Sequence, residues 1–318
     1  MLVVFWSKKL KKKMNFSDDA MDSNSTTKVR QVTTFGLVTF LLLAIVVLPI
    51  GIVGNILVII VVKKKRYLHS KTNLLLANLA ASDLMANVLA YTVAAARAIP
   101  IPVTAFGKFL CKINSFYPAL SLCSILTLTV IALERYNAIV KPLSTGLKFE
   151  KRTLRYFITV IWILSLVAAT PLVHYSKYNS DYRCERTWST TARFIFWTSS
   201  FIVVIGIPLI IIIYCYCRII RTLYFQHQIV PMNIPREVDA REKKKVVKLS
   251  IVVTSVFIFS FIPFAIVREL EIRGPVPNAV SVFGLCSVLL SSVLNPFIYA
   301  YQSTNYRQAF KETIICCR

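Results

Sequence analysis

The chain has 318 residues, of which 56% are hydrophobic and 16% are charged, and its formal net charge is +24. This apolar content exceeds what a soluble fold normally needs and is typical of a membrane protein. The basic residues are divided among short loops rather than gathered in one domain, which argues against nucleic-acid binding as the reason for the charge.

Seven stretches are long and apolar enough to cross a bilayer, which takes about 20 helical residues because hydrocarbon offers no partner for backbone polar groups. They cover residues 36–62, 72–96, 113–133, 156–176, 194–217, 249–267 and 274–306, the last including loop at both ends. Only the second stretch contains a charged residue, Asp83. The sequence therefore predicts an all-α membrane protein, with residues 36–301 forming a seven-transmembrane helix bundle.

The orientation of the bundle follows from the Lys and Arg residues. With the first loop inside, the cytoplasmic loops and tail hold 22 of them, the opposite loops hold 9 and the N-terminal segment holds 7. Short cytoplasmic loops are enriched in these residues. We therefore expect a multi-pass plasma-membrane protein with residues 1–35 as an extracellular segment.

One part of that segment does not fit. Five lysines within residues 8–13 would lie outside the cell, and the apolar run before them is too short for a secretory signal peptide. Our hypothesis is that the natural start is Met14 and that residues 1–13 are not native. Two glycosylation sequons follow, at Asn15 and Asn24, both on the side predicted to be extracellular.

The longest predicted cytoplasmic connection covers about residues 218–248. It contains Pro231 and Pro235, which we expect to interrupt the helix, and then the basic run 241–245, which we expect to restart it.

The C-terminal residues 302–318 are predicted to form a tail with a short amphipathic eighth helix on the inner membrane face. Its apolar residues recur at helical spacing: Tyr306, Phe310 and Ile314. Cys316 and Cys317 follow this helix, and palmitoylation of either would anchor it.

An ordered series of motifs runs along the chain: Gly54-Asn55, Asn78 to Asp83, Cys111, Glu134-Arg135-Tyr136, Trp162, Cys184, Pro208, Tyr216, Pro263, and Asn295-Pro296 with Tyr299. Each is weak alone, but one set in every span, in this order, is highly specific. From Gly54 to Cys317 the chain resembles the rhodopsin-like (class A) G-protein-coupled receptors. The resemblance implies a receptor that binds an extracellular ligand and activates heterotrimeric G proteins by nucleotide exchange. Arrestin and a receptor kinase are further implied partners.

The run Glu134-Arg135-Tyr136 ends the third span, where a permanently charged guanidinium reaches water or pairs with the neighbouring carboxylate. An ordinary charged helix end is the alternative interpretation. The resemblance assigns Arg135 to G-protein contact and adds Tyr216, Asn295, Pro296 and Tyr299 to the activation switch. Many relatives hold this Arg with an acid at the foot of the sixth span, where this chain has Lys243. Lys cannot pair with Arg135, so we expect a resting contact that is weaker or that uses only Glu134, and measurable basal activity.

Asp83 needs polar neighbours, since a carboxylate within a span raises the free energy of membrane insertion by about 2.5–3.5 kcal/mol. The resemblance places four residues around it: Asn55, Ser124, Ser291 and Asn295. It implies an allosteric sodium ion there in the inactive state, and no other cofactor. A hydrogen-bonded structural carboxyl without an ion is the alternative. Pro296 removes a backbone donor and predicts a kink, either static or part of a bistable element.

The resemblance also implies a disulfide between Cys111 and Cys184, on the oxidising side near span ends, with free thiols as the alternative. Cys111 lies 24 residues before Arg135, one fewer than usual in the family, so we expect residues near Pro118 to face differently. Phe261 stands where relatives usually have Trp. It can fill the pocket floor but offers no indole donor.

Two ligand classes are disfavoured. Tyr117 occupies the place of the Asp that amine receptors need, and residues 274–306 lack the Lys that retinal requires. Parts of the chain resemble neuropeptide receptors of the tachykinin, neuropeptide Y and RFamide kind, so we expect a peptide, with a non-peptide small molecule as the alternative. The candidate pocket residues are Tyr117, Ser121, Trp188, Phe261, Arg268 and Leu285.

Other protein classes fit less well. The three histidines, His69, His174 and His227, lie at scattered span ends and suggest no catalytic metal site, so we do not expect an enzyme. A transporter would be expected to show repeats or several buried ionisable groups. A receptor that does not couple to G proteins, or that acts through arrestin, shares all these motifs and remains an open alternative.

Overall fold

The computed structural model describes residues 43–98, 105–141, 149–178, 184–226, 234–274 and 276–315. The chain divides into two units, Met1–Thr33 and Thr34–Arg318, and every described residue belongs to the second. The predicted start at Met14, the sequons at Asn15 and Asn24, and the acylation sites Cys316 and Cys317 lie outside the described residues.

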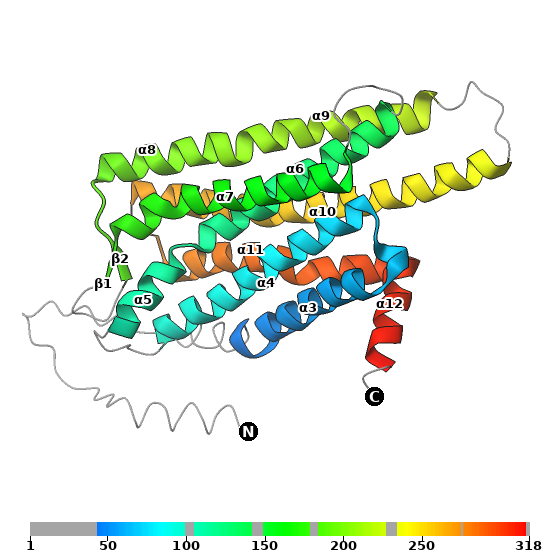
Figure 1. Cartoon of the computed structure of the whole chain (residues 1–318). Helices are drawn as coiled ribbons and strands as arrows, with labels where there is room; N and C mark the ends of the chain where they lie inside the picture. Colours follow the sequence, from blue (N-terminus) through cyan, green and yellow to red (C-terminus); the bar gives the residue numbers. More distant parts are fainter. Residues whose placement is uncertain are drawn as a thin grey trace, which may run out of the picture. The chain divides into compact units, whose positions relative to one another are not determined.

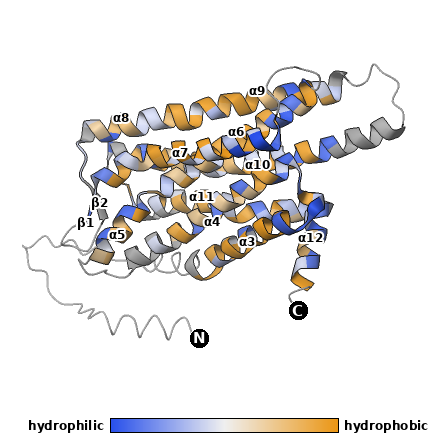
Figure 2. Ribbon diagram, in the orientation of Figure 1, coloured by the Kyte–Doolittle hydropathy of each residue, from blue (hydrophilic) through white to orange (hydrophobic). Residues whose placement is uncertain are grey.

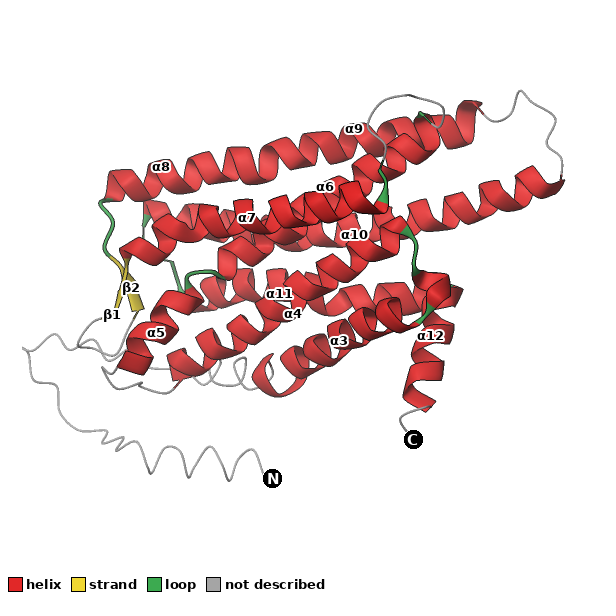
Figure 3. Ribbon diagram, in the orientation of Figure 1, coloured by secondary structure: helices red, strands yellow, loops and turns green. Residues whose placement is uncertain are grey.

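Helices make up nearly all of the described part (Figure 3). In chain order they are η1 (Leu43–Val47), α3 (Leu48–Lys64), η2 (Arg66–Leu68), α4 (Lys71–Ala98), α5 (Ala105–Asn114), α6 (Tyr117–Val140), α7 (Lys151–Tyr175), α8 (Thr190–Ser200), η3 (Phe201–Gly206), α9 (Ile207–Arg221), η4 (Thr222–Gln226), α10 (Ile234–Arg273), α11 (Asn278–Gln302) and α12 (Thr304–Ile315). Between α7 and α8, the strands β1 (Ser176–Tyr178) and β2 (Cys184–Arg186) pair antiparallel. Figure 1 shows this hairpin at one end of the bundle and α12 at the other.

Seven helical segments of the described part are long and apolar enough to cross a membrane. They are Ile45–Lys64, Lys71–Ala90, Ala105–Val140, Lys151–Tyr175, Thr191–Tyr224, Lys243–Glu271 and Phe283–Gln302. Hydrophobic residues follow most of their length (Figure 2), and large ones such as Ile210 and Phe259 are exposed, as expected of helices surrounded by hydrocarbon. The predicted seven-helix membrane fold is confirmed, and the chain is a multi-pass membrane protein.

The third span differs from the single helix predicted at 113–133. It consists of α5 and α6, separated by a turn at Ser115 and Phe116. Pro118 lies in the first turn of α6, where its missing N–H costs no hydrogen bond, so it starts a new helix rather than distorting an old one.

The connection predicted at 218–248 is also wrong in its extent. η4 continues the fifth span to Gln226, and α10 begins at Ile234 with Pro235 in its first turn. The basic run 241–245 lies inside α10, because a helix can continue past the hydrocarbon where its charged residues meet water.

The bundle is held at close helix contacts that small residues permit. A Cβ placed on Gly54 of α3 would lie 2.9 Å from the Pro296 ring of α11, and one on Gly51 would lie 2.7 Å from Val293. Small residues allow this approach in membranes, where packing rather than water exclusion drives helix association.

Hydrogen bonds of Asn78 join three further helices. Asn78 of α4 donates to Thr127 over 2.8 Å and accepts from the Trp162 indole over 2.9 Å, which joins α4 to α6 and α7.

The amphipathic helix expected within residues 302–318 is α12 (Thr304–Ile315). Tyr306 and Phe310 are buried, whereas Ile314 is exposed. The ring centroid of Tyr306 lies 5.3 Å from that of Tyr299 in α11, so α12 packs directly beneath the seventh span.

Candidate functional site

Glu134 and Arg135 form a charged pair near the C-terminal end of α6. The Arg135 guanidinium donates through Nε and Nη2 to both carboxylate oxygens of Glu134 over 2.5 Å. Thr72 of α4 donates its hydroxyl to Glu134 Oε2 over 3.1 Å. The Glu134 side chain is 3% exposed and that of Arg135 is 15% exposed. A two-point contact of this kind is stronger and more directional than a single one, so it fixes the guanidinium against its own helix.

Lys243, at the foot of the sixth span, is exposed in α10. Arg135 instead contacts the carboxylate of its sequence neighbour, Glu134. Breaking this pair would require only a rotation of the Arg135 side chain, without a change in the distance between α6 and α10.

The tyrosines predicted to take part in the switch surround this end of the bundle. Tyr216 of α9 and Thr254 of α10 share a hydrogen bond of 3.2 Å between their hydroxyls. The Tyr136 ring lies 5.9 Å from that of Tyr214 between centroids. Tyr299 is fully buried, and its hydroxyl has no hydrogen-bond partner among the described residues. A buried hydroxyl without a partner is unfavourable, so a rearrangement that gave Tyr299 one would be stabilised.

The centre of the bundle holds a polar cluster around Asp83 of α4. Asn295 Nδ2 donates to Asp83 Oδ2 over 2.7 Å, and the Ser124 hydroxyl donates to Oδ1 over 3.1 Å. The hydroxyls of Ser82 and Ser124 lie 2.9 Å apart. Asp83 is only 4% exposed, so these bonds supply the polar company that a carboxylate inside a membrane needs.

The other two residues expected here face differently. Asn55 donates to the backbone carbonyls of Gly51 and Ser292, which joins α3 to α11. The Ser291 hydroxyl donates to the Val288 carbonyl within its own helix. The structure thus brings Ser124 and Asn295 onto Asp83, whereas Asn55 and Ser291 bond to backbone.

The polar cluster has the oxygen donors that a hard cation such as sodium prefers: a carboxylate and two hydroxyls. The residues present therefore fit an ion of this kind.

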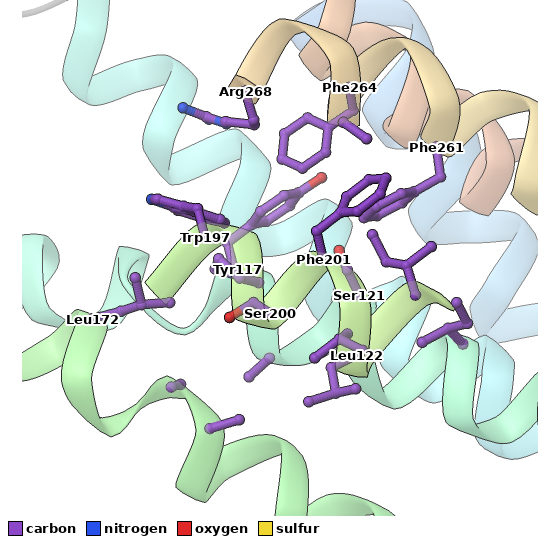
Figure 4. A pocket seen from close by; sticks show the side chains of 18 of the residues that line it. Tyr117, Ser121, Leu122, Leu172, Trp197, Ser200, Phe201, Phe261, Phe264 and Arg268 are labelled. Atoms are coloured by element: carbon purple, nitrogen blue, oxygen red, sulfur yellow. The ribbon is translucent and has the colours of Figure 1, made fainter. Parts of the chain in front are cut away.

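A cavity of about 920 Å³, open mouth included, lies at the other end of the bundle, between α6, α7, α8, η3 and α10. Tyr117, which lines it, precedes Arg135 by 18 residues on one helix, which corresponds to about 27 Å. Figure 4 shows the aromatic side chains of Trp197, Phe201, Phe261 and Phe264 arranged around Tyr117, with Phe201 beside Phe261. Most of the wall is therefore aromatic or aliphatic.

Among the described residues, the charged members of the cavity wall are two neighbours in α10, Arg268 and Glu269. Arg268 donates to Glu271 over 2.6 Å, and its guanidinium carbon lies 5.1 Å from the Phe264 ring centroid. Ser281 of α11 donates to the same carboxylate over 2.6 Å. Glu269 is a second charged wall residue. The orientation of Arg268 is thus fixed by an acid and a ring, as in a preorganised anion-binding group.

Four of the six residues predicted for the pocket line this cavity: Tyr117, Ser121, Phe261 and Arg268. Trp188 and Leu285 are not among the residues that line it. Trp188 instead packs between Tyr175 and Phe196, and Leu285 packs against the buried cluster formed by Leu48, Ala86, Ala90, Tyr117, Leu120 and Leu289.

Sequence reasoning missed the fifth-span part of the wall. Trp197, Ser200 and Phe201 line the cavity together with Phe264 of α10. Their signal was present as an aromatic cluster at the outer end of the fifth span, but it resembles the lipid-facing aromatic residues common at such ends.

Cys111 is buried in α5 and is disulfide-bonded. Cys184 begins β2, but its side chain lies outside the described residues. The pairing of Cys111 with Cys184 therefore stays a prediction.

A membrane bundle with a cavity at one end and a shielded arginine at the other has the architecture of a seven-helix receptor. The family model for seven-transmembrane receptors of the rhodopsin family matches residues 54–299. The chain belongs to this family, which confirms the class A G-protein-coupled receptor predicted from its motifs.

Several curated relatives align over most of the chain. It is 28% identical over 301 residues to a QRFP-like peptide receptor of Branchiostoma floridae, covering 86% of this chain and 76% of the relative. It is 29% identical over 290 residues to somatostatin receptor type 5 of Rattus norvegicus, covering 87% and 77%. It is also 30% identical over 302 residues to a Gq-coupled rhodopsin of Mizuhopecten yessoensis, covering 84% and 58%. Overall identity therefore does not select the ligand.

Proposed function

We propose that the chain is a plasma-membrane receptor for a peptide, with its N-terminus outside the cell, and that the bound peptide drives nucleotide exchange on a heterotrimeric G protein. The observation that carries this proposal is the placement of the cavity and Arg135 at opposite ends of α6. Tyr117 in the cavity and Arg135 at the opposite end belong to the same continuous helix, so a ligand-induced shift of α6 at Tyr117 can change the position of Arg135.

The chemistry of the cavity favours a peptide over the other ligands of the family. Its aromatic wall suits an apolar side chain, and Arg268 and Glu269 at one edge suit the polar groups of a peptide end. Retinal is disfavoured, because residues 274–306 contain no Lys for a Schiff base. Relatives named as peptide receptors, including the QRFP-like and somatostatin receptors, support the same choice. A non-peptide small molecule is the alternative.

G-protein contact requires Arg135 to leave Glu134. The pair is largely shielded in this structure, so it represents a resting arrangement in which the guanidinium is not available to a partner. We propose that the released Arg135 contacts the G protein, and that arrestin and a receptor kinase act on the same cytoplasmic face.

Four further features belong to this proposal. A sodium ion would bind Asp83 and Ser124 and favour the resting state. Glycans on Asn15 and Asn24 would mark the extracellular segment, and a disulfide would join Cys111 to Cys184. Palmitate on Cys316 or Cys317 would hold the end of α12 at the membrane.

The experiment compares nucleotide exchange by the wild-type receptor and the Arg135→Ala variant on a panel of purified G proteins, with a library of amidated peptides. We expect one peptide group to stimulate the wild type, and Arg135→Ala to lose stimulation while retaining peptide binding. Arg268→Ala is the matched control, since it should weaken peptide binding without lowering ligand-independent exchange. A wild-type receptor at the cell surface that stays silent across the panel would favour a non-peptide ligand or a receptor that does not couple.

A further inference from the structure

A second apolar cavity lies between α10 and the fifth span, which is formed by α8, η3 and α9. We refer to it as the lateral slot. Its volume is about 1320 Å³, open mouth included. Its deeper wall includes Leu128 of α6, Leu209 and Ile212 of α9, and Ile258 of α10. The slot is therefore a separation between two membrane spans rather than a depression in a loop.

The slot opens toward the bilayer. Its wall includes Phe201, Ile262, Ile266 and Leu270, whose side chains are 51%, 46%, 55% and 46% exposed. All four belong to the membrane-spanning segments Thr191–Tyr224 and Lys243–Glu271. Because the medium around such segments is hydrocarbon, the slot is accessible to lipid chains rather than to water.

The polar groups of the slot are few, and most are already paired. The Thr254 hydroxyl bonds to Tyr216 at the deep end, and Arg273 pairs with Glu269 over 3.0 Å at the outer end. Thr198 of α8 is the exception, because its buried hydroxyl has no hydrogen-bond partner among the described residues. The Thr198 oxygen is enclosed within the wall, so the surface that the slot offers to an occupant between its two ends is almost entirely apolar.

One feature of the backbone supports a built site. The wall residues Phe201 and Ile205 lie in η3, a π-helical segment inside the fifth span. Such segments are rare and are found frequently at functional sites.

The slot is continuous with the ligand cavity. Seven residues line both, including Phe257 and Phe261, whose rings stack with centroids 5.7 Å apart. An occupant of the slot would therefore touch the same aromatic side chains as a ligand in the cavity.

We propose that the lateral slot binds an acyl chain of a membrane phospholipid, with the headgroup beside the Glu269–Arg273 pair. An acyl chain fits an apolar slot that opens sideways to hydrocarbon, and a zwitterionic headgroup matches two opposite charges at its outer end. This proposal rests on the membrane-spanning fold and not on the identity of the ligand or on G-protein coupling.

The test uses the full-length receptor in phosphatidylcholine nanodiscs that contain a phosphatidylcholine with a photoactivatable diazirine in one acyl chain. After irradiation, the labelled residues are mapped by mass spectrometry. We expect labels to concentrate on the parts of α8, η3, α9 and α10 that line the slot. Filling the slot with Ile266→Trp should reduce this labelling several-fold. The matched control is Phe259→Trp, which enlarges an exposed residue of the same helix outside the slot.

Monodispersity on size-exclusion chromatography confirms that each variant is folded, and Ile262→Trp replaces Ile266→Trp if the latter does not fold. Labels spread over all lipid-facing helices in proportion to exposure would overturn the proposal. So would an equal effect of the slot and control variants. A parallel sample with a photoactivatable sterol distinguishes the lipid classes, because labelling of the slot by the sterol alone would overturn the assignment to an acyl chain. No outcome depends on finding a ligand, so failure here is separate from failure of the proposed function.

Discussion

The side-chain amide of Asn295 donates to the carboxylate of Asp83 over 2.7 Å, joining residues 212 positions apart in the sequence. This bond connects the seventh span to the second beside Pro296, where the backbone of α11 lacks a donor. Any ligand of the Asp83 carboxylate therefore acts directly on the part of α11 that carries Tyr299.

Replacing Asp83 by Asn should remove a sodium-dependent stabilisation of the receptor. The amide keeps the size of the side chain but lacks the charge that attracts a cation. For wild-type receptor, the apparent melting temperature in nanodiscs should rise and saturate as sodium chloride replaces choline chloride at constant ionic strength. Asp83→Asn should show no such rise. Ser291→Ala is the control and should keep the rise, because its hydroxyl bonds only within α11. A rise that persists in Asp83→Asn would place the ion elsewhere.

Weakening the ion pair between Glu134 and Arg135, near the C-terminal end of α6, should raise basal activity. Glu134→Gln removes the charge that holds Arg135, so we expect several-fold more ligand-independent nucleotide exchange than in the wild type. Thr72→Val removes one bond to Glu134 and should raise exchange less. Both are compared at equal surface expression, with Arg135→Ala as the inactive reference. Unchanged exchange in Glu134→Gln would mean that this pair does not restrain the resting receptor.

The membrane fold was predictable because a bilayer leaves few ways to satisfy a backbone, so length and apolar content define each span. Helix extents were less predictable. The apolar run that marks a span ends at the edge of the hydrocarbon, but a helix can extend beyond it. The helix α10 includes the polar residues 241–245, where backbone hydrogen bonds and not hydropathy determine its extent. Likewise, the spacing between Cys111 and Arg135 indicated that residues near Pro118 face differently, but it did not predict the turn that separates α5 from α6. That turn depends on local hydrogen bonds such as Ser115 to the Cys111 carbonyl.

The residues of the candidate sites were also predictable only in part. The family resemblance placed four polar residues around Asp83. Ser124 and Asn295 bond to it, whereas Asn55 and Ser291 bond to backbone carbonyls. Trp188 and Leu285, which were also predicted for the pocket, do not line the cavity. Trp188 packs between Tyr175 and Phe196, and Leu285 packs against a buried cluster from several helices. Spacing in the sequence does not reveal either set of contacts.

Adding a methyl group at Gly54 should destabilise the bundle. The new Cβ would lie 2.9 Å from the rigid ring of Pro296, so α3 and α11 would have to separate. Overpacking of this kind costs about 1–3 kcal/mol. We expect Gly54→Ala to lower the apparent melting temperature, as followed by the loss of monodisperse receptor on heating. Gly274→Ala is the matched control, since a Cβ there has no heavy atom within 4 Å. Equal melting of the two variants would contradict the close contact.

The ion pair between Lys65 and Glu312 should make the docking of α12 dependent on pH. Lys65 Nζ lies 2.6 Å from Glu312 Oε2, and Gln308 donates to the other oxygen over 2.8 Å. The hydrogen bond from Lys65 is the main reason that the pKa of Glu312 is held below its ordinary value. A lowered pKa means that the contribution to docking is complete above the ordinary glutamate value and is lost as pH falls through the lowered one.

Amide hydrogen exchange of Thr304–Ile315, expressed as protection factors that correct for intrinsic rates, measures this docking. In the wild type, protection should be constant near neutral pH and should fall below the ordinary pKa of glutamate. Glu312→Gln keeps the shape of the side chain without the charge, so its protection should be lower at neutral pH and should not fall further in that acidic range. Since the residues of this pair are partly exposed, added salt should also reduce wild-type protection. A wild-type receptor whose α12 protection changes with neither acid nor salt would show that Tyr306 and Phe310 dock the helix without this ion pair.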